Sequence, residues 1–119
     1  MTPTLVFKSR QPYLALGSPG GSKIITTVAQ TILNYYIFGM NLNEAVVGPR
    51  FHHQWQPDVL YVEQRGFDVN TIQKLISMGH TVKERSPIGE VMALGFSQDG
   101  TFITPVADPR RSGGCATGF

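Results

Sequence analysis

The stretch that most constrains this sequence is Gly17-Ser18-Pro19-Gly20-Gly21-Ser22-Lys23, which joins two segments of different periodicity. Residues 13–16 have the composition of a strand, and a long apolar helix is predicted to begin directly after the turn. Two adjacent glycines at a strand-to-helix turn allow backbone N–H groups to face a ligand without an intervening Cβ. The helix N-terminus adds unpaired N–H groups and a partial positive charge. The turn therefore predicts a backbone site for an anion or oxyanion, and a tight turn that needs glycine only for its geometry is the alternative.

The helix after the turn is predicted over residues 22–38, with Ser22 as its N-cap and Gly39 in a left-handed conformation after the last turn. Its apolar residues form two adjoining rows: Ile24, Val28, Ile32 and Tyr35, and then Ile25, Ala29, Leu33 and Tyr36. Two such rows make a stripe wide enough to pack flat on a sheet. The helix N-terminus then lies at the rim of that sheet, as in an active site.

The rest of the chain predicts strands and helices in the order of an α+β fold. Residues 4–7 and 13–16 form one expected hairpin, and residues 91–96 and 101–106 form another around Asp99-Gly100. Between them we expect a strand over 59–63, a helix over 68–78 and a strand over 80–84. The helix has Asp68 as its cap, Gly79 at its end and a buried face of Val69, Ile72, Leu75 and Ile76. Antiparallel hairpins with helices on one side indicate α+β, or a layered sandwich with helices outside.

Three polar features are predicted to be structural. Residues 41–44 have the spacing of a capping box that opens a short helix through Val47. His52 and His53 could be a catalytic base or metal ligands, but adjacent strand residues face opposite sides, so hydrogen-bonded structural histidines are expected. Asp108 and Arg110 are expected to pair and pin the glycine-rich tail, in preference to a catalytic role for the carboxylate.

Several classes of site are excluded by composition and spacing. The P-loop motif fails, because serine precedes lysine in Gly21-Ser22-Lys23 and no glycine has the required spacing. A net charge of +2 from ten scattered Lys and Arg is too small to indicate nucleic-acid binding. The single cysteine, Cys115, excludes an internal disulfide, and with three histidines it shows no zinc-ligand spacing, so no metal or cofactor is expected. The most apolar run, residues 24–40, contains too many polar residues for a membrane span.

Four ordered motifs resemble one known family. Met1-Thr-Pro-Thr4, Gly17-Ser-Pro-Gly-Gly-Ser22, Pro49-Arg-Phe-His-His-Gln54 and Asp108-Pro-Arg110 are similar, in the same order, to the C-terminal part of the small subunit of γ-glutamyltransferase, also called glutathione hydrolase. The resemblance covers essentially all 119 residues, which we treat as a single partial domain, 1–119. Four motifs in order are far more specific than any one of them. Lys23 departs from the arginine usual in the family, which leaves the turn intact.

The resemblance implies an N-terminal-nucleophile hydrolase with a four-layer αββα sandwich. In the family a precursor cleaves itself into two subunits, and the new N-terminal threonine of the small subunit attacks the γ-glutamyl amide of glutathione. The γ-glutamyl group then passes to water, an amino acid or a peptide. Gly20 and Gly21 match the pair whose backbone amides form the oxyanion hole and contact the substrate. The threonine and the groups that bind the glutamyl α-carboxylate and α-amine match nothing here, so we expect an inactive chain that needs the rest of the small subunit and the large subunit. The family also suggests a periplasmic or extracellular location.

Three alternatives remain at this stage. The chain could be a light-chain-like, non-enzymatic interaction module, or a generic anion-binding domain that uses the Gly20-Gly21 turn. Removal of Met1 could also expose Thr2 as an N-terminal nucleophile, but Pro3 follows directly and the family match places Thr2 at a non-nucleophilic position. For part of the enzyme and for the interaction module alike, a four-layer fold cut through its small subunit would leave edges and faces exposed, so association or a homo-oligomer is expected.

Overall fold

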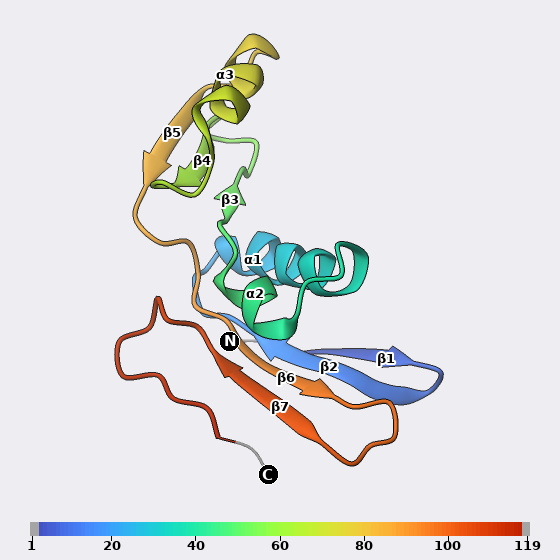
Figure 1. The fold of residues 1–119 in the computed structure, drawn as a ribbon. Helices are drawn as coiled ribbons and strands as arrows, with labels where there is room; N and C mark the ends of the chain where they lie inside the picture. The colour runs from blue at the N-terminus through green and yellow to red at the C-terminus, as the bar shows by residue number, and fades with distance from the viewer. Residues whose placement is uncertain (1–2, 118–119) are drawn as a thin grey trace.

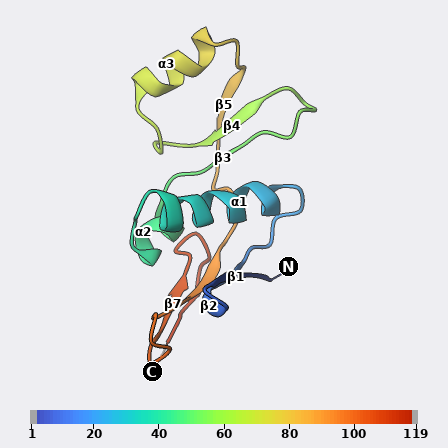
Figure 2. The same cartoon turned by 90° about the vertical axis from the view of Figure 1, so that its right-hand side faces the viewer.

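The computed structural model of the chain describes residues 3–117 and has two parts (Figure 1). The main part is a four-stranded antiparallel sheet in the order β1-β2-β6-β7, and the second is a three-stranded sheet in the order β3-β4-β5. The α1 and α2 helices lie between the two sheets (Figure 2). The radius of gyration is 15.4 Å, whereas a compact domain of this length has about 13.5 Å. The chain is therefore extended, with the smaller sheet and its helix projecting as a lobe.

The main sheet is built from the two predicted hairpins. The first consists of β1 (Thr4–Lys8) and β2 (Gln11–Gly17), and the second of β6 (Met92–Phe96) and β7 (Ile103–Ala107). Ser9 and Arg10 both have positive φ, at 52° and 67°, so the first turn has two residues instead of the five expected. The β2 and β6 strands pair antiparallel from Leu14 and Gly95 to Gly17 and Met92. This pairing brings the end of β2 beside the chain that enters β6.

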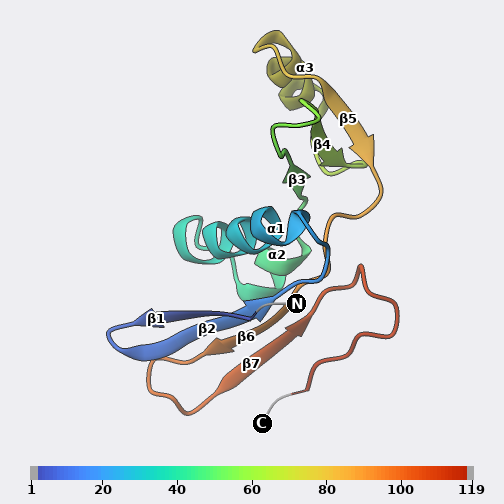
Figure 3. The same ribbon diagram turned by 180° about the vertical axis from the view of Figure 1, so that it is seen from behind.

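One face of the main sheet is covered by α1 (Lys23–Ile32) and its π-helical continuation η1 (Leu33–Ile37), and by the short α2 (Leu42–Val47). The core between them is apolar and contains Leu14, Leu16, Val28, Leu42, Val46, Val91, Ala93 and Val106. Within residues 3–117 no helix or strand covers the opposite face (Figure 3). Leu5, Phe7 and Leu94 of this sheet are exposed.

The predicted packing of α1 is half right. The row that begins at Ile24 packs against the core, but the second row is exposed, and Ile25 has 77% of its surface accessible. The sheet contacts only one row, and the polar Thr27 and Thr31 beside it are fully buried. The Ser22 side chain makes no capping hydrogen bond in the described structure, although Ser22 is the N-cap residue and Gly39 has the predicted positive φ of 67°.

The projecting lobe contains β3 (Phe51–His52), β4 (Leu60–Glu63), α3 (Val69–Ser77) and β5 (Val82–Arg85). The β4 and β5 strands are parallel, and α3 is the crossover between them. Asp68 caps α3 as predicted, by accepting a hydrogen bond from the Thr71 N–H at 2.9 Å. The predicted buried face of α3 is wrong for Val69 and Ile76, which are 71% and 54% exposed. The small lobe has too little sheet to cover more than the half-buried Ile72 and Leu75.

Candidate active site

The Gly20-Gly21 turn lies between the end of β2 and the first turn of α1. Gly20 and Gly21 have φ values of 134° and 58°, which residues other than glycine rarely adopt. Their carbonyls are occupied, since Gly20 accepts from the Lys23 N–H at 3.2 Å and Gly21 from the Ile24 N–H at 3.1 Å. Their own N–H groups donate to no acceptor within residues 3–117. The turn thus offers two unpaired donors at a helix N-terminus, as an anion or oxyanion site requires.

The space in front of Gly21 is open. A Cβ added there would meet no atom within 4 Å among the described residues. A Cβ on Gly20 would lie 3.7 Å from the Lys23 Cβ and 3.9 Å from the Gly89 Cα, both ordinary contacts. Gly20, Lys23 and Gly89 also line a depression of about 190 Å³ with Glu90 and Arg110. The conformation of the turn requires glycine, and its amides remain accessible.

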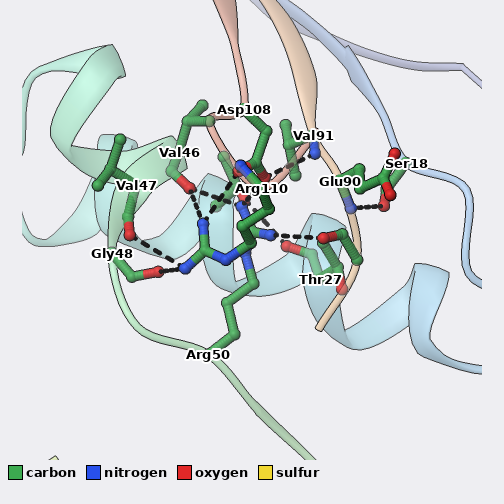
Figure 4. Close-up of polar contacts among 12 residues, drawn as sticks. Ser18, Thr27, Val46, Val47, Gly48, Arg50, Glu90, Val91, Asp108 and Arg110 are labelled. Carbon is green, nitrogen blue, oxygen red and sulfur yellow. Dashed lines mark hydrogen bonds and ion pairs between the residues drawn. The ribbon is translucent and has the colours of Figure 1, made fainter. Parts of the chain in front are cut away.

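Residues 88–91, which we call the strap, run behind the turn and lead into β6. Three of the strap's N–H groups donate to side chains. Ile88 donates to the Glu63 carboxylate at 2.7 Å. Glu90 donates to the Ser18 hydroxyl at 3.0 Å and Val91 to the Asp108 carboxylate at 2.8 Å (Figure 4). The carbonyls of residues 88 and 89 accept from one guanidinium nitrogen, Nη1 of Arg50. The strap is therefore fixed by side chains from four separate segments of the chain.

A buried network of four charged side chains supports the strap. Asp108 accepts hydrogen bonds from Arg50 at 2.7 Å and from Arg110 at 3.1 Å, and Arg110 also binds Glu63 at 2.6 Å. The predicted pairing of Asp108 with Arg110 is confirmed. The roles of Arg50 and Glu63 were not predicted from the sequence. The available signal was weak, namely one arginine between a helix-ending proline and an apolar strand.

The two arginines of the network also bind the carbonyls at the C-terminal end of α2. Arg50 donates to the Val46 carbonyl at 2.6 Å, and Arg110 donates to the carbonyls of Val46, Val47 and Gly48 at 2.9–3.1 Å (Figure 4). These carbonyls belong to the last turn of a helix, where the backbone has unpaired acceptors and a partial negative charge. Two guanidinium groups therefore satisfy the acceptors and stabilise the end of the helix.

Burial and the neighbouring charges shift the pKa values of three side chains in the network. Burial raises the pKa of Asp108, but N–H donors from Val91 and Arg110 and the nearby Arg50 charge outweigh it, so this pKa lies below its ordinary value. Burial lowers the pKa of Arg110, but its contacts with Glu63 more than compensate and raise it. Burial lowers the pKa of Arg50, and the charge of Asp108 opposes that change. Asp108 is therefore held as the anion of an ion pair, because its pKa is lowered and not raised as in a general acid.

The two histidines have structural contacts, as predicted. His52 is buried, with Nδ1 at 2.8 Å from the Thr26 hydroxyl and Nε2 at 3.1 Å from the Gln54 side chain. His53, just after β3, contacts Asp58 at 3.0 Å. Among residues 3–117 no three His, Cys, Asp or Glu side chains are grouped to hold a metal ion. In the same part of the chain, every helix is too short or too polar to cross a membrane.

Residues 1–118 match the family described as gamma-glutamyltranspeptidase. The chain belongs to this family. It is 40% identical over 119 residues to the glutathione hydrolase proenzyme of Escherichia coli, which covers 100% of this chain and 20% of the proenzyme. The glutathione hydrolase proenzyme of Bacillus subtilis is 38% identical over 115 residues, covering 95% of this chain and 19% of the proenzyme.

Solved structures agree with this assignment. The Helicobacter pylori gamma-glutamyltranspeptidase T380A mutant has a TM-score of 0.89 and 41% identity, and the match covers 93% of this chain and 61% of that one. The transpeptidase CapD of Bacillus anthracis, at 24% identity, has the same fold with a TM-score of 0.80, covering 98% of this chain and 70% of that one. The predicted α+β fold of the N-terminal-nucleophile hydrolases is thus confirmed. This chain spans about a fifth of the length of the curated relatives named here.

Proposed function

We propose that this chain is part of a γ-glutamyltransferase that cleaves the γ-glutamyl amide of glutathione and passes the γ-glutamyl group to water, amino acids or peptides. The proposal rests on family membership and on one observation: the backbone N–H groups of Gly20 and Gly21 have no acceptor among the described residues. Attack on an amide carbonyl places negative charge on its oxygen. Donors that already point at this oxygen stabilise the tetrahedral intermediate without reorganisation. Gly20 and Gly21 are therefore assigned to the oxyanion hole.

In this proposal the nucleophile comes from outside residues 1–119. It is a threonine at the N-terminus of the small subunit, activated by its own free amine. The remaining partners are the rest of the small subunit and the large subunit. They would cover the apolar sheet face that includes Leu5 and Leu94, and the exposed row of α1 that begins at Ile25, since exposed surfaces of this kind mark interfaces. The 119-residue chain alone is expected to be inactive.

A chimera tests the proposal. The matched segment of the Escherichia coli glutathione hydrolase proenzyme is replaced by residues 1–119, and release of the chromophore from a γ-glutamyl chromogenic amide is measured. The expected result is self-cleavage into two subunits and turnover with this substrate or glutathione. A chimera that folds and is cleaved but remains inert would contradict the proposed function.

A pair of glycine substitutions tests the oxyanion assignment within the active chimera. Gly21→Ala adds a methyl group beside the proposed donors at a φ of +58°, which favours glycine. If this displaces the donor, kcat should fall by about 10²–10³, the scale for loss of an oxyanion contact. Gly39→Ala is the matched control, because Gly39 also has a left-handed φ and open space around its Cβ position. Gly21→Ala with kcat close to that of Gly39→Ala would reject the assignment.

A further inference from the structure

Ser18 is a buried serine whose hydroxyl lies between the glycine turn and the strap. It has 0% of its surface exposed. Its Oγ donates to the Pro19 carbonyl at 2.7 Å and accepts from the Glu90 N–H at 3.0 Å. A hydroxyl with one donor and two acceptor positions can make both bonds at once. Ser18 therefore links the turn directly to the strap (Figure 4).

The bond to the Pro19 carbonyl also fixes the neighbouring amide. The Pro19 C=O and the Gly20 N–H belong to one planar peptide group, which is trans, so they point in opposite directions. Holding the carbonyl toward the Ser18 hydroxyl turns the Gly20 N–H the other way, away from the protein interior. Rotation of this peptide group would break the Ser18 bond and aim the donor elsewhere.

The anchor on the other side of Ser18 is rigid. Glu90 lies in the strap, whose neighbours on both sides are held by Arg50 and Asp108. Gly89 is packed so closely that an added Cβ would lie 2.6 Å from Oγ1 of Thr27 and 3.0 Å from Oγ of Ser18. The strap therefore has no room to move toward α1, and the position of the Ser18 hydroxyl is set by the buried ion network.

We propose that Ser18 is a positioning residue of the oxyanion hole, which sets the direction of the Gly20 N–H through the Pro19 carbonyl. This proposal rests on the proposed function, because it assigns Ser18 a role in that same site. Ser18 does not touch the substrate. Its contribution should appear when charge develops on the carbonyl oxygen, and not when the substrate binds.

The test compares two variants in the chimera described above. Ser18→Ala removes both hydroxyl bonds, and Thr31→Val is the matched control. Thr31 is also fully buried, and its hydroxyl bond to the Thr27 carbonyl at 3.0 Å stays within α1. Ser18→Ala should lower kcat by about 10- to 100-fold, as expected when a group is misplaced and not removed. KM should stay within about threefold, because uniform binding is unchanged.

A second readout separates positioning from general destabilisation. A boronic acid analogue of glutamate forms a tetrahedral, anionic adduct with the nucleophile, whereas the product glutamate does not. Ser18→Ala should weaken the boronate by a factor similar to the loss in kcat and leave the inhibition constant of glutamate within about threefold. Thr31→Val should change neither inhibition constant by more than about threefold, even if it lowers the melting temperature as much as Ser18→Ala does.

The outcomes distinguish the two proposals. An inert wild-type chimera that folds and is cleaved overturns the proposed function, and this inference with it. An active wild-type chimera in which Ser18→Ala keeps kcat within threefold overturns only the positioning role of Ser18. If Ser18→Ala does not fold, Ser18→Cys, which replaces the hydroxyl by a slightly larger and much weaker hydrogen-bonding thiol, is tested for the same loss in kcat and boronate affinity. Equal losses for the boronate and glutamate would assign Ser18 to substrate binding or stability and overturn the inference.

Discussion

Asp108 gives the sharpest test of the buried network, through the substitution Asp108→Asn. The carboxylate is fully buried and accepts hydrogen bonds from Arg50 and Arg110 and from the Val91 N–H. Asparagine keeps the shape of the side chain but presents an NH₂ group to one set of donors. It also leaves the positive charge of Arg50 buried without its carboxylate.

The expected cost follows from burial and geometry. Removing one partner of a buried ion pair costs about 3–5 kcal/mol, far more than an exposed pair contributes. With a urea dependence of about 2 kcal/mol per molar, the unfolding midpoint should fall by roughly 1.5–2.5 M. The measurement is urea unfolding followed by far-UV circular dichroism at a fixed protein concentration. Asp58→Asn is the control, because Asp58 pairs with His53 at the surface with 90% of its side chain exposed, and its midpoint should move by less than about 0.3 M.

The contribution of Asp108 to stability should depend on pH, with a sign set by the direction of its pKa shift. The pKa of Asp108 is lower in the folded protein than its ordinary value, so its ionisation stabilises the fold above about pH 4. That contribution is lost as the pH falls through the folded pKa, where the protonated carboxyl becomes as neutral as asparagine. The difference in midpoint between wild type and Asp108→Asn should therefore shrink below pH 4. A difference that is no larger than that of the control, or that does not change with pH, would refute the role assigned to this ion pair.

Three further predictions concern local structure. Gly89→Ala should destabilise the fold by about 2–4 kcal/mol from backbone strain and overpacking, whereas Gly39→Ala, with a similar φ and open space, should cost only about 1–2 kcal/mol in chemical unfolding. Equal costs would show that close packing of the strap does not matter. Asn41→Ala should cost about 1 kcal/mol by removing the capping box of α2, and a change under 0.3 kcal/mol would argue against that cap. An NMR titration should give Asp99 a pKa of about 2 because Ser97 and a backbone N–H donate to it, and Ser97→Ala should raise this pKa toward the ordinary value.

Much of the fold was predictable because its signals are local. The Asp99-Gly100 turn, the capping box at Asn41 and the strand-to-helix turn at Gly20-Gly21 each depend on a few consecutive residues. The structure has all of them where the sequence places them. The assignment of Gly20 and Gly21 to an oxyanion hole stays a prediction.

The features that were missed depend on distant residues or on surfaces that the pattern alone cannot assign. Arg50 and Asp108 are 58 positions apart, and Arg110 and Glu63 are 47 apart, so no short motif contains the network. The apolar pattern of α1 does not say which row contacts the sheet, and Ile25 is exposed although Ile24 packs against the core. The same limit explains why Val69 of α3, predicted to be buried, is 71% exposed in the described structure.

The spacing of the network has a consequence for the order in which the fold can form. On a ribosome that adds about 5–20 residues per second, Arg50 is synthesised roughly 3–12 s before Asp108, because 58 positions separate them. During that interval the Arg50 guanidinium lacks the Asp108 carboxylate, which directly follows β7. The strap behind the glycine turn is thus held on both sides only after β7 and Asp108 have been made, because Asp108 accepts from both Arg50 and the Val91 N–H. Contacts between such distant positions slow folding, and this one ties the geometry of the turn to a residue made much later.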